Sequence, residues 1–360
     1  KTPDRRHIDN ILAGNLCRCT GYGTIVDAAI TVTKTDTIDQ FHAREKATIE
    51  KLETLMNEPG LQLDWQGRTY FAPKITEELT ELLATYPDAV LLAGATDVGL
   101  WVTKQHRELQ TVIYIGQIES LKSITEKEGG LHIGAGATYS DAWRPLEKLH
   151  PDLGELIRRI ASTQIRNCGT IGGNIANGSP IGDMPPALIA LGAQLHLRSK
   201  KGLREILLED FFIEYGQQDL KSGEFVEAVF LPHHKPESHF ATYKISKRFD
   251  QDISAVCGAF HLILNGNTVE DIRICYGGMA GTPRRAYKAE QELIGAEWTD
   301  ATIASAMLKM TEDFQPLNDM RASSQYRMVI AQNLLRKFHI ETTIPDQATR
   351  IVGEGGLAYA

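Results

Sequence analysis

Two cysteines stand one residue apart, Cys17 and Cys19, inside the glycine-bounded stretch "GNLCRCTGYG". Thiolates placed there gain from the N-terminal dipole of a helix that we expect to begin near Thr24, and such pairs ligate soft metals. An iron-sulfur cluster or a structural zinc needs four ligands, and the other three cysteines lie in separate segments. The pair therefore leaves two interpretations open, metal ligands or free loop thiols.

Two glycine-rich stretches could hold a phosphate group: "LLAGATDVG" from Leu91 to Gly99 and "GTIGGNIANGSPIGD" from Gly169 to Asp183. Glycine lets backbone amides approach an anion closely, and the threonines, Asn174 and Ser179 add short hydrogen-bonding side chains. Neither stretch has the ending of a P-loop or the spacing of a Rossmann fingerprint. Each alone could be a tight turn, but the pair fits a large nucleotide whose pyrophosphate and rings need separate walls.

Two further groups of polar residues are weaker candidates. The charged loop "SKRFDQDIS", residues 246–254, is typical of a solvated turn. His233, His234 and His239 with Glu237 follow no metal-ligand spacing, and the prolines around them indicate a surface loop, so we expect no metal there. No Ser-His-Asp arrangement or paired-carboxylate signature can be read from the sequence.

Alternating helices and strands must position these residues. The patterns predict helices over residues 4–13, 24–32, 44–58, 76–87, 141–165 and 184–192, strands over 89–99, 111–116 and 193–199, and a hairpin over 123–138. From about Phe240 two alternating runs surround an Asn265-Gly266-Asn267 turn, and two helical stretches follow and end near His339. The sequence predicts an α+β protein with a separate, small α+β unit near its C-terminal end.

Composition narrows the classes of function. The 360 residues allow two or three domains, and 42% hydrophobic residues are typical of a packed protein. A net charge of -8, with no cluster of Lys and Arg, argues against nucleic-acid binding. No stretch is long and apolar enough for a membrane span and no signal peptide opens the chain, so we expect a cytoplasmic protein without membrane contact. The first residue, Lys1, indicates a processed product or a fragment of something longer.

The stretch "NLCRCTGYGTIVDAA" resembles the last part of the helical [2Fe-2S] domain of the xanthine dehydrogenase and aldehyde oxidase family, the molybdenum hydroxylases. The resemblance implies that Cys17 and Cys19 are two of the four cluster ligands. In that family the other two come from a Cys-Gly-x-Cys motif that this sequence does not contain, so we expect them from residues before Lys1 or from a separate chain. Residues 1–45 are then the C-terminal part of the helical domain, and residues 46–64 a linker.

The glycine-rich stretches resemble those of the same family's two-part FAD-binding domain, of the vanillyl-alcohol-oxidase (PCMH) type. The resemblance assigns residues 65–235 to this domain, 236–345 to a CO dehydrogenase flavoprotein-like C-terminal domain and 346–360 to a tail. In the family the first stretch binds the FAD pyrophosphate through backbone amides, and the second holds the ribityl and flavin side. Carried over position by position, the implied FAD contacts are Leu91, Leu92, Ala93, Gly94, Ala95, Thr96, Asp97, Val98, Ile160, Thr170, Gly172, Gly173, Asn174, Asp183, Val226 and Lys244.

Two of these inferences concern details of the flavin environment. Ile160 stands where mammalian relatives place a phenylalanine ahead of the second stretch. Arg248 and Asp250 lie in a loop that, in the family, influences whether NAD or oxygen reaches the flavin, so the resemblance implies that they tune the flavin and make no bonds.

The resemblance implies an iron-sulfur and FAD subunit of xanthine dehydrogenase. Electrons would come from a molybdenum cofactor on a large partner subunit, pass through [2Fe-2S] to FAD and leave to NAD as co-substrate, in a hetero-oligomer such as a dimer of heterodimers. One alternative is the FAD subunit of an aldehyde oxidase or another molybdenum hydroxylase that uses oxygen or a different acceptor. Another is a flavin-binding interaction protein without turnover. The hydroxylated substrate does not follow from this sequence, because its pocket would lie on the partner.

Overall fold

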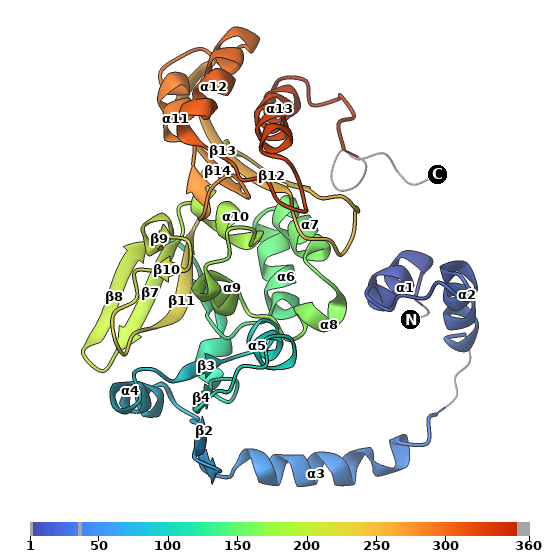
Figure 1. Ribbon diagram of the computed structural model, residues 1–360. Coiled ribbons are helices and arrows are strands. Elements are labelled where there is room, and N and C mark those ends of the chain that lie inside the picture. Colours follow the sequence, from blue (N-terminus) through green and yellow to red (C-terminus); the bar gives the residue numbers. More distant parts are fainter. Residues whose placement is uncertain (1–2, 35–37, 351–360) are drawn as a thin grey trace.

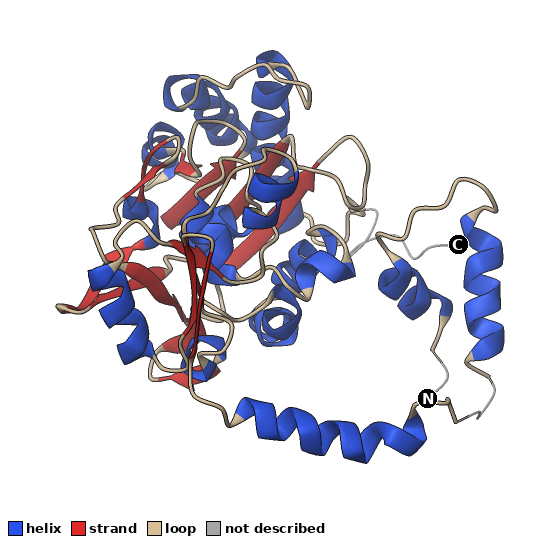
Figure 2. Ribbon diagram, turned by 60° about the horizontal axis from the view of Figure 1, so that its bottom comes forward, coloured by secondary structure: helices blue, strands red, loops and turns tan. Residues whose placement is uncertain are grey.

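The computed structural model describes residues 3–34 and 38–350, so residues 351–360 of the expected tail lie outside the described residues. A pair of N-terminal helices stands beside a larger body, and a long connection joins the two (Figure 1). The strands gather inside the body, with helices around them (Figure 2). None of the helices in the described ranges is both long and apolar enough to cross a membrane.

The N-terminal pair consists of α1 (Arg5–Leu12) and α2 (Tyr22–Val32). The Asp4 side chain accepts a hydrogen bond from a backbone amide in the first turn of α1, which satisfies one of the donors that a helix start leaves free. Ile8 and Val26 are the buried residues of the pair. Most of its other side chains are exposed, which is the pattern of a unit that has little core of its own.

The pair touches the body at the short helix α8 (Thr163–Arg166). The Thr163 hydroxyl donates a hydrogen bond to the Asn10 carbonyl at 2.8 Å. Gly14 lies so close to Ser162 that a Cβ atom on this glycine would come within 2.4 Å of the serine Cβ. A close backbone approach and a hydrogen bond thus fix this junction.

The connection contains η1 (His42–Arg44) and α3 (Glu45–Met56) and leads into a four-stranded sheet with the order β1-β2-β4-β3. β1 pairs antiparallel with β2, whereas β2 and β3 both pair parallel with β4. Phe71, Leu79 and Ile113 are part of its small core. Its strands and helices are β1 (Leu61–Trp65), β2 (Arg68–Ala72), α4 (Thr76–Thr85), β3 (Val90–Leu92), α5 (Val98–Thr103) and β4 (Thr111–Tyr114).

A five-stranded antiparallel sheet with the order β5-β6-β11-β7-β8 forms the second layer of the body. Side chains alternate along its strands, so that Ile133, Leu195 and Val229 enter a large core with the neighbouring helices while their neighbours face outward. The strands are β5 (Ile124–Lys127), β6 (Gly130–Gly134), β7 (Gln194–Ser199), β8 (Gly202–Leu207) and β11 (Phe225–Pro232). The helices are η2 (Glu119–Lys122), α6 (Tyr139–Leu149), α7 (Pro151–Arg159), α8, α9 (Ile171–Asn177), α10 (Met184–Ala190) and η3 (Leu208–Phe211), and a short ribbon joins β9 (Phe212–Glu214) to β10 (Gln217–Gln218).

The C-terminal unit is an antiparallel sheet with helices on one face and its own core around Phe260, Tyr276 and Phe338. Its other face packs on α10, which joins this unit to the body. The elements are β12 (His239–Ile245), β13 (Val256–Asn265), β14 (Thr268–Gly277), β15 (Arg284–Arg285), α11 (Tyr287–Leu293), α12 (Asp300–Asp313) and α13 (Ser324–Thr343).

Three expectations about the elements were wrong in detail. The strand expected over residues 89–99 ends at Leu92, and residues 98–103 are helical. The second glycine-rich stretch lies outside the helices predicted above, yet α9 occupies much of its first half. β1 begins at Leu61, inside the stretch expected to be linker, because it pairs with β2 across a tight turn at Gln66 and Gly67, both with positive φ.

Candidate cofactor site

The structure brings the two glycine-rich stretches into contact. A Cβ atom on Gly94 would lie 1.7 Å from the carbonyl oxygen of Cys168, so only glycine allows this approach. Ala95 next to it adopts the left-handed region at a φ of 59°. The first stretch therefore makes a sharp turn between β3 and α5, directly against the start of the second stretch.

Thr170 and Gly172 shape the second stretch. The Thr170 hydroxyl accepts a hydrogen bond from the Gly173 amide at 3.0 Å and so caps the start of α9. The Gly172 amide donates to the Ala135 carbonyl at 2.9 Å, and a Cβ atom there would lie 2.3 Å from the Ala135 Cβ. Gly172 is thus required for packing of α9 on the end of β6, while Gly173 stays exposed.

Asn174 carries a buried polar atom without a partner. Its side-chain oxygen Oδ1 is buried and accepts no hydrogen bond from the described residues. A buried acceptor left unpaired is costly, so a donor from a bound molecule would stabilise this side chain. Together with the close contact between Gly94 and Cys168, this orphaned oxygen fits a site that is completed by a ligand.

Asp183, Lys244 and Ser254 form a buried polar cluster where the body meets the C-terminal unit. Lys244 Nζ lies 2.5 Å from Asp183 Oδ2, and the Ser254 hydroxyl donates to Asp183 Oδ1 at 2.5 Å. Lys244 Nζ also donates to Ser254 Oγ at 3.0 Å. Each charge is paired and hydrogen-bonded, as burial requires.

Tyr139 connects the two stretches electrostatically. Burial raises the pKa of its phenol well above the ordinary value, and the nearby carboxylates of Asp183 and Asp97 raise it further. Asp97 belongs to the first stretch and Asp183 ends the second, so a residue of each stretch lies near Tyr139.

The charged loop 246–254 is tied to the end of α7. Arg159 donates to the Phe249 carbonyl at 2.8 Å and to the Lys244 carbonyl at 2.7 Å, and its guanidinium stacks 4.1 Å from the centre of the Phe249 ring. Arg158 lies 3.3 Å from Asp250. The loop expected to be a solvated turn is therefore anchored by two consecutive arginines, which sequence reasoning missed.

The remaining implied contacts lie in several different elements. Arg248 pairs with Asp252 inside the loop at 3.5 Å. The Ile160 carbonyl accepts a hydrogen bond from the Arg166 guanidinium at 2.9 Å. Val226 packs in the large core. Leu91 and Leu92 end β3 and are half-buried, and they are followed by the half-buried Ala93, Thr96 and Val98.

Cys17 and Cys19 lie together in the loop between α1 and α2. The Cys17 sulfur lies 3.2 Å from the Thr20 hydroxyl. Hydrogen bonds from the Thr20 side chain, the Thr20 amide and the Cys19 amide lower the pKa of Cys17 to about 7. No group of three or more metal-ligating side chains occurs within residues 3–34 and 38–350, so this chain offers two thiols and not a complete metal site there. All five cysteines are free.

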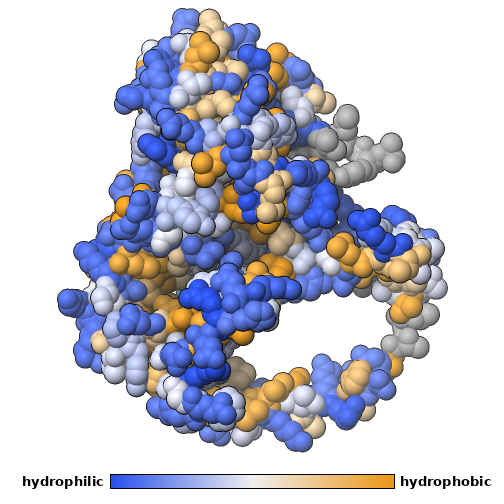
Figure 3. Space-filling model, in the orientation of Figure 1, coloured by the Kyte–Doolittle hydropathy of each residue, from blue (hydrophilic) through white to orange (hydrophobic). Residues whose placement is uncertain are grey.

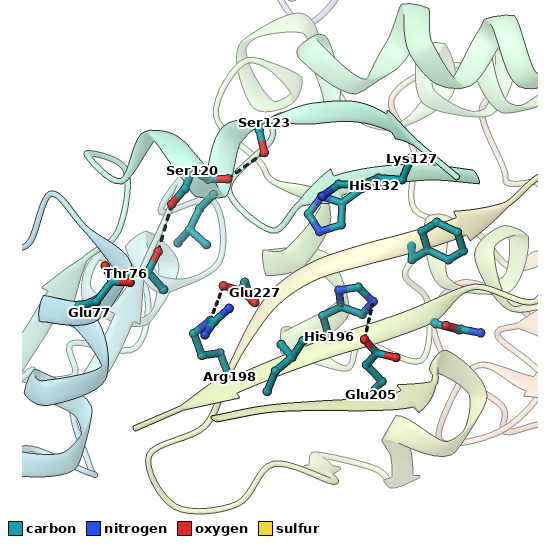
Figure 4. A pocket seen from close by; sticks show the side chains of 14 residues that line it. Thr76, Glu77, Ser120, Ser123, Lys127, His132, His196, Arg198, Glu205 and Glu227 are labelled. Carbon is teal, nitrogen blue, oxygen red and sulfur yellow. Dashed lines mark hydrogen bonds and ion pairs between the residues drawn. The ribbon is translucent and has the colours of Figure 1, made fainter. Parts of the chain in front are cut away.

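A separate polar pocket of about 650 Å³ lies on the outer face of the five-stranded sheet, and none of the implied cofactor residues lines it. His132, His196, Arg198 and Glu205 rise from that sheet, and Thr76 and Ser120 close the pocket from the other side (Figure 4). Arg198 pairs with Glu227 in this pocket, and His196 lies 3.7 Å from Glu205.

Comparison with known proteins assigns the body and the C-terminal unit to two families. Residues 63–234 match the family described as FAD binding domain in molybdopterin dehydrogenase, and residues 241–342 match the CO dehydrogenase flavoprotein C-terminal domain. The putative xanthine dehydrogenase FAD-binding subunit of Escherichia coli (strain K12) is 30% identical over 75% of this chain and 94% of its own length.

Two further similarities concern a longer enzyme and a solved structure. Xanthine dehydrogenase 1 of Arabidopsis thaliana is 29% identical over 87% of this chain, which spans 28% of that enzyme's length. A chain of carbon monoxide dehydrogenase from Hydrogenophaga pseudoflava superposes with a TM-score of 0.71 at 29% identity, covering 74% of this chain and 94% of that one. The chain belongs to the molybdenum hydroxylase family, as an FAD-binding subunit.

Proposed function

We propose that this chain is the iron-sulfur and FAD part of a xanthine dehydrogenase. Electrons would come from a molybdenum cofactor on a partner chain, pass through [2Fe-2S] to FAD and leave to NAD. The observation that carries the proposal is that one chain holds both the Cys17 and Cys19 loop and the paired glycine-rich stretches, on units that touch through α8.

The residues around Gly94 and Asn174 would hold FAD, which supplies hydride and single-electron chemistry when bound. Backbone amides at residues 91–98 would bind the anionic pyrophosphate, since glycine keeps side chains out of the way. Asp183 and Lys244 would fix the strand end beside the flavin, since both are buried and paired. Neither stretch contains a His or Cys that could form a covalent link to the flavin, so FAD would bind non-covalently.

Cys17 and Cys19 would be two of the four ligands of a [2Fe-2S] cluster. Metal binding requires the thiolate, and a thiol with a pKa near 7 is about half ionised at neutral pH, far more than an ordinary cysteine. The match to the Arabidopsis enzyme covers a larger share of this chain than residues 63–234 and 241–342 span, so the similarity extends beyond the flavin part.

A second candidate function is electron transfer to oxygen or another acceptor, as the FAD subunit of a different molybdenum hydroxylase. The structural match to a carbon monoxide dehydrogenase supports this second candidate. This chain is 29% identical to that protein, and it is also 29% identical to the Arabidopsis xanthine dehydrogenase. The proposal includes xanthine as the substrate, NAD as the electron acceptor and a hetero-oligomer of two kinds of subunit. It also includes tuning of the flavin by Arg248 and Asp250 and a location in the cytoplasm.

The decisive experiment measures two reactions separately: reduction of the bound flavin by NADH and oxidation of a purine. The chain alone, loaded with FAD, should reduce an artificial dye with NADH and should not oxidise a purine. Assembled with the molybdenum chain and the segment that completes the clusters, it should couple purine oxidation to NAD reduction. Cys17→Ser should remove an iron-sulfur signal and this coupling while sparing the NADH-to-dye reaction.

The outcomes distinguish the alternatives. Reaction with oxygen in preference to NAD supports the second candidate, and folded, flavin-bearing protein that NADH does not reduce supports a flavin-binding protein without turnover. An unchanged iron content and full coupled turnover in Cys17→Ser would show that the cysteine pair is not part of the electron path.

A further inference from the structure

The segment that follows α13 is held on the body. The connection that contains α3 leaves an open gap to the body (Figure 3), whereas the chain beyond α13 runs back toward α7 (Figure 1). We call residues 344–350 the strap. It reaches Arg350, whose side chain is only 16% exposed. A buried guanidinium is costly unless acidic groups pair with it, so the strap needs partners at this point.

Arg350 joins the body to the C-terminal unit through two carboxylates. Its guanidinium donates hydrogen bonds to Asp152, in the first turn of α7, and to Glu341 in α13, the latter at 2.6 Å. Burial alone would raise the pKa of Glu341, but hydrogen bonds, above all those from Arg350, lower it to about 2. Glu341 is therefore ionised at neutral pH, and Arg350 supplies its counter-charge.

Asp152 extends this contact to β12. Its carboxylate oxygen Oδ2 accepts a hydrogen bond from the Thr242 amide at 2.9 Å, and its backbone carbonyl accepts one from the Thr242 hydroxyl at 3.2 Å. The Asp152 side chain is 5% exposed, so both of its oxygens need partners inside the protein. One buried carboxylate thus binds Arg350 of the strap with one oxygen and the backbone of β12 with the other.

The next residue of β12, Tyr243, is held by the same groups. Its hydroxyl donates to Glu341 at 2.7 Å, and the Arg350 guanidinium lies 5.3 Å from the centre of its ring. One residue further, the Lys244 carbonyl accepts a hydrogen bond from Arg159 at the end of α7. Consecutive residues of β12 are therefore fixed on α7 and α13 by groups that include Arg350 and its two partners.

We infer that Arg350 is a positioning residue for the cofactor site, an inference that rests on the proposed role of Lys244 beside FAD. Thr242 and Lys244 are two residues apart and so share one face of β12. The Lys244 ammonium ends in the buried cluster with Asp183 and Ser254. A displacement of Thr242 on α7 would therefore move this ammonium within the cluster. Arg350 would act on FAD through β12 and not by touching it.

The alternative is that Arg350 only stabilises the junction of the two units. Its loss would then affect FAD binding through the stability of the whole fold, whether or not Lys244 is present. A positioning residue differs in that its effect needs the side chain that it positions. Two substitutions that act on one contact are non-additive, whereas independent effects add.

The experiment measures FAD binding to the full chain in a double-mutant cycle. Arg350→Met should weaken FAD binding about tenfold, and the double variant with Lys244→Met should bind FAD about as weakly as Lys244→Met alone. Arg350→Lys keeps a cation between the two carboxylates and should restore most of the affinity. The control is Arg336→Met, at an exposed arginine of α13, which should bind FAD like the wild type.

Two buried cysteines give a second measurement that needs no FAD. Cys257 on β13 pairs with Lys244 of β12, whereas Cys275 lies on β14, on the other side of β13. A displaced β12 in Arg350→Met should make alkylation of Cys257 by iodoacetamide at least about fivefold faster and leave Cys275 slow. Global destabilisation would accelerate both cysteines alike. Mass spectrometry of the alkylated peptides separates the two sites.

Losses of FAD affinity that add in the double variant, or equal acceleration at Cys257 and Cys275, overturn the inference. So does unchanged FAD affinity in Arg350→Met. In each case a wild-type chain that binds FAD and passes electrons from NADH to a dye upholds the proposed function, whereas a wild-type chain that binds no FAD overturns both.

A variant closer to the wild type covers the case in which Arg350→Met does not fold. Asp152→Asn keeps an acceptor for the Thr242 amide and removes the charge that pairs with Arg350. It should give the same non-additivity with Lys244→Met and the same selective alkylation of Cys257, each in smaller measure. Additive effects or equal alkylation of both cysteines in Asp152→Asn would overturn the inference as well.

Discussion

The ammonium group of Lys244 lies 2.5 Å from the carboxylate of Asp183, and both side chains are buried where β12 of the C-terminal unit meets the start of α10. The pair joins two units that the family assignment separates, since Asp183 belongs to residues 63–234 and Lys244 to residues 241–342. This buried cluster is therefore a property of both units together, and the proposed flavin environment would depend on both.

Replacing Lys244 by Met should leave a buried carboxylate with Ser254 as its remaining partner. Removing one member of a buried ion pair costs about 3 kcal/mol or more, so the free energy of unfolding should fall by that amount and FAD binding should weaken. Urea denaturation and FAD titration measure the two effects. Lys201→Met, at an exposed lysine, is the control and should change neither.

Gly94→Ala should separate the two glycine-rich stretches. The added Cβ would lie 1.7 Å from the Cys168 carbonyl oxygen, so the backbone must move and FAD affinity should fall by about tenfold or more. Gly99→Ala is the matched control, because a Cβ there meets nothing within 4 Å and the residue lies in α5. Equal FAD affinity of the two variants would mean that the contact does not shape the binding site.

The Cys17 thiol should react with iodoacetamide with a midpoint near pH 7 in the chain without a cluster. The Thr20 hydroxyl stabilises the thiolate, so Thr20→Val should move the midpoint upward, toward the ordinary pKa of 9.0. Mass spectrometry of peptides alkylated at a series of pH values gives both midpoints. An identical midpoint in Thr20→Val would rule out this hydrogen bond as the cause, and Thr31→Val, at a hydroxyl bonded within α2, controls for the loss of a threonine.

His261 should make the protein sensitive to acid. Burial lowers its pKa from 6.5 to about 3, assisted by His234, Arg273 and His150. The folded pKa lies below the unfolded one, so the unfolded state binds more protons between these values. The stability contribution is complete above about pH 6.5 and is lost as the pH falls toward 3. His261→Phe should flatten the dependence of the unfolding free energy on pH in this window, and a profile as steep as that of the wild type would assign the acid sensitivity to other groups.

Elements with a local signal could be predicted from the sequence. The Asn265-Gly266-Asn267 turn predicted the hairpin of β13 and β14, because φ is positive at Gly266 and few residues adopt that conformation. The helix predicted over residues 4–13 forms as α1, which Asp4 caps. These elements depend on residues close in sequence.

α9 could not be predicted in this way, because glycine and asparagine disfavour helices. It forms because Thr170 caps it and because Gly172 allows it to lie against Ala135, which is a contact between distant segments. The same reason hid Ser254 and Arg159 as members of the candidate site. Their partners, Asp183 and the Phe249 carbonyl, lie far away in sequence and are brought near only by the packing of two units.

The junction at α8 has a consequence for the rate of electron flow. The Thr163 hydroxyl holds the N-terminal pair on one side of this helix, and Gly169 and Thr170 begin the second glycine-rich stretch a few residues later. Electron tunnelling slows steeply with distance, so α8 would act as the spacer between the two redox centres if both are bound as proposed. A larger side chain at position 162 would push against Gly14. It would then leave both cofactors bound and still slow electron transfer between them.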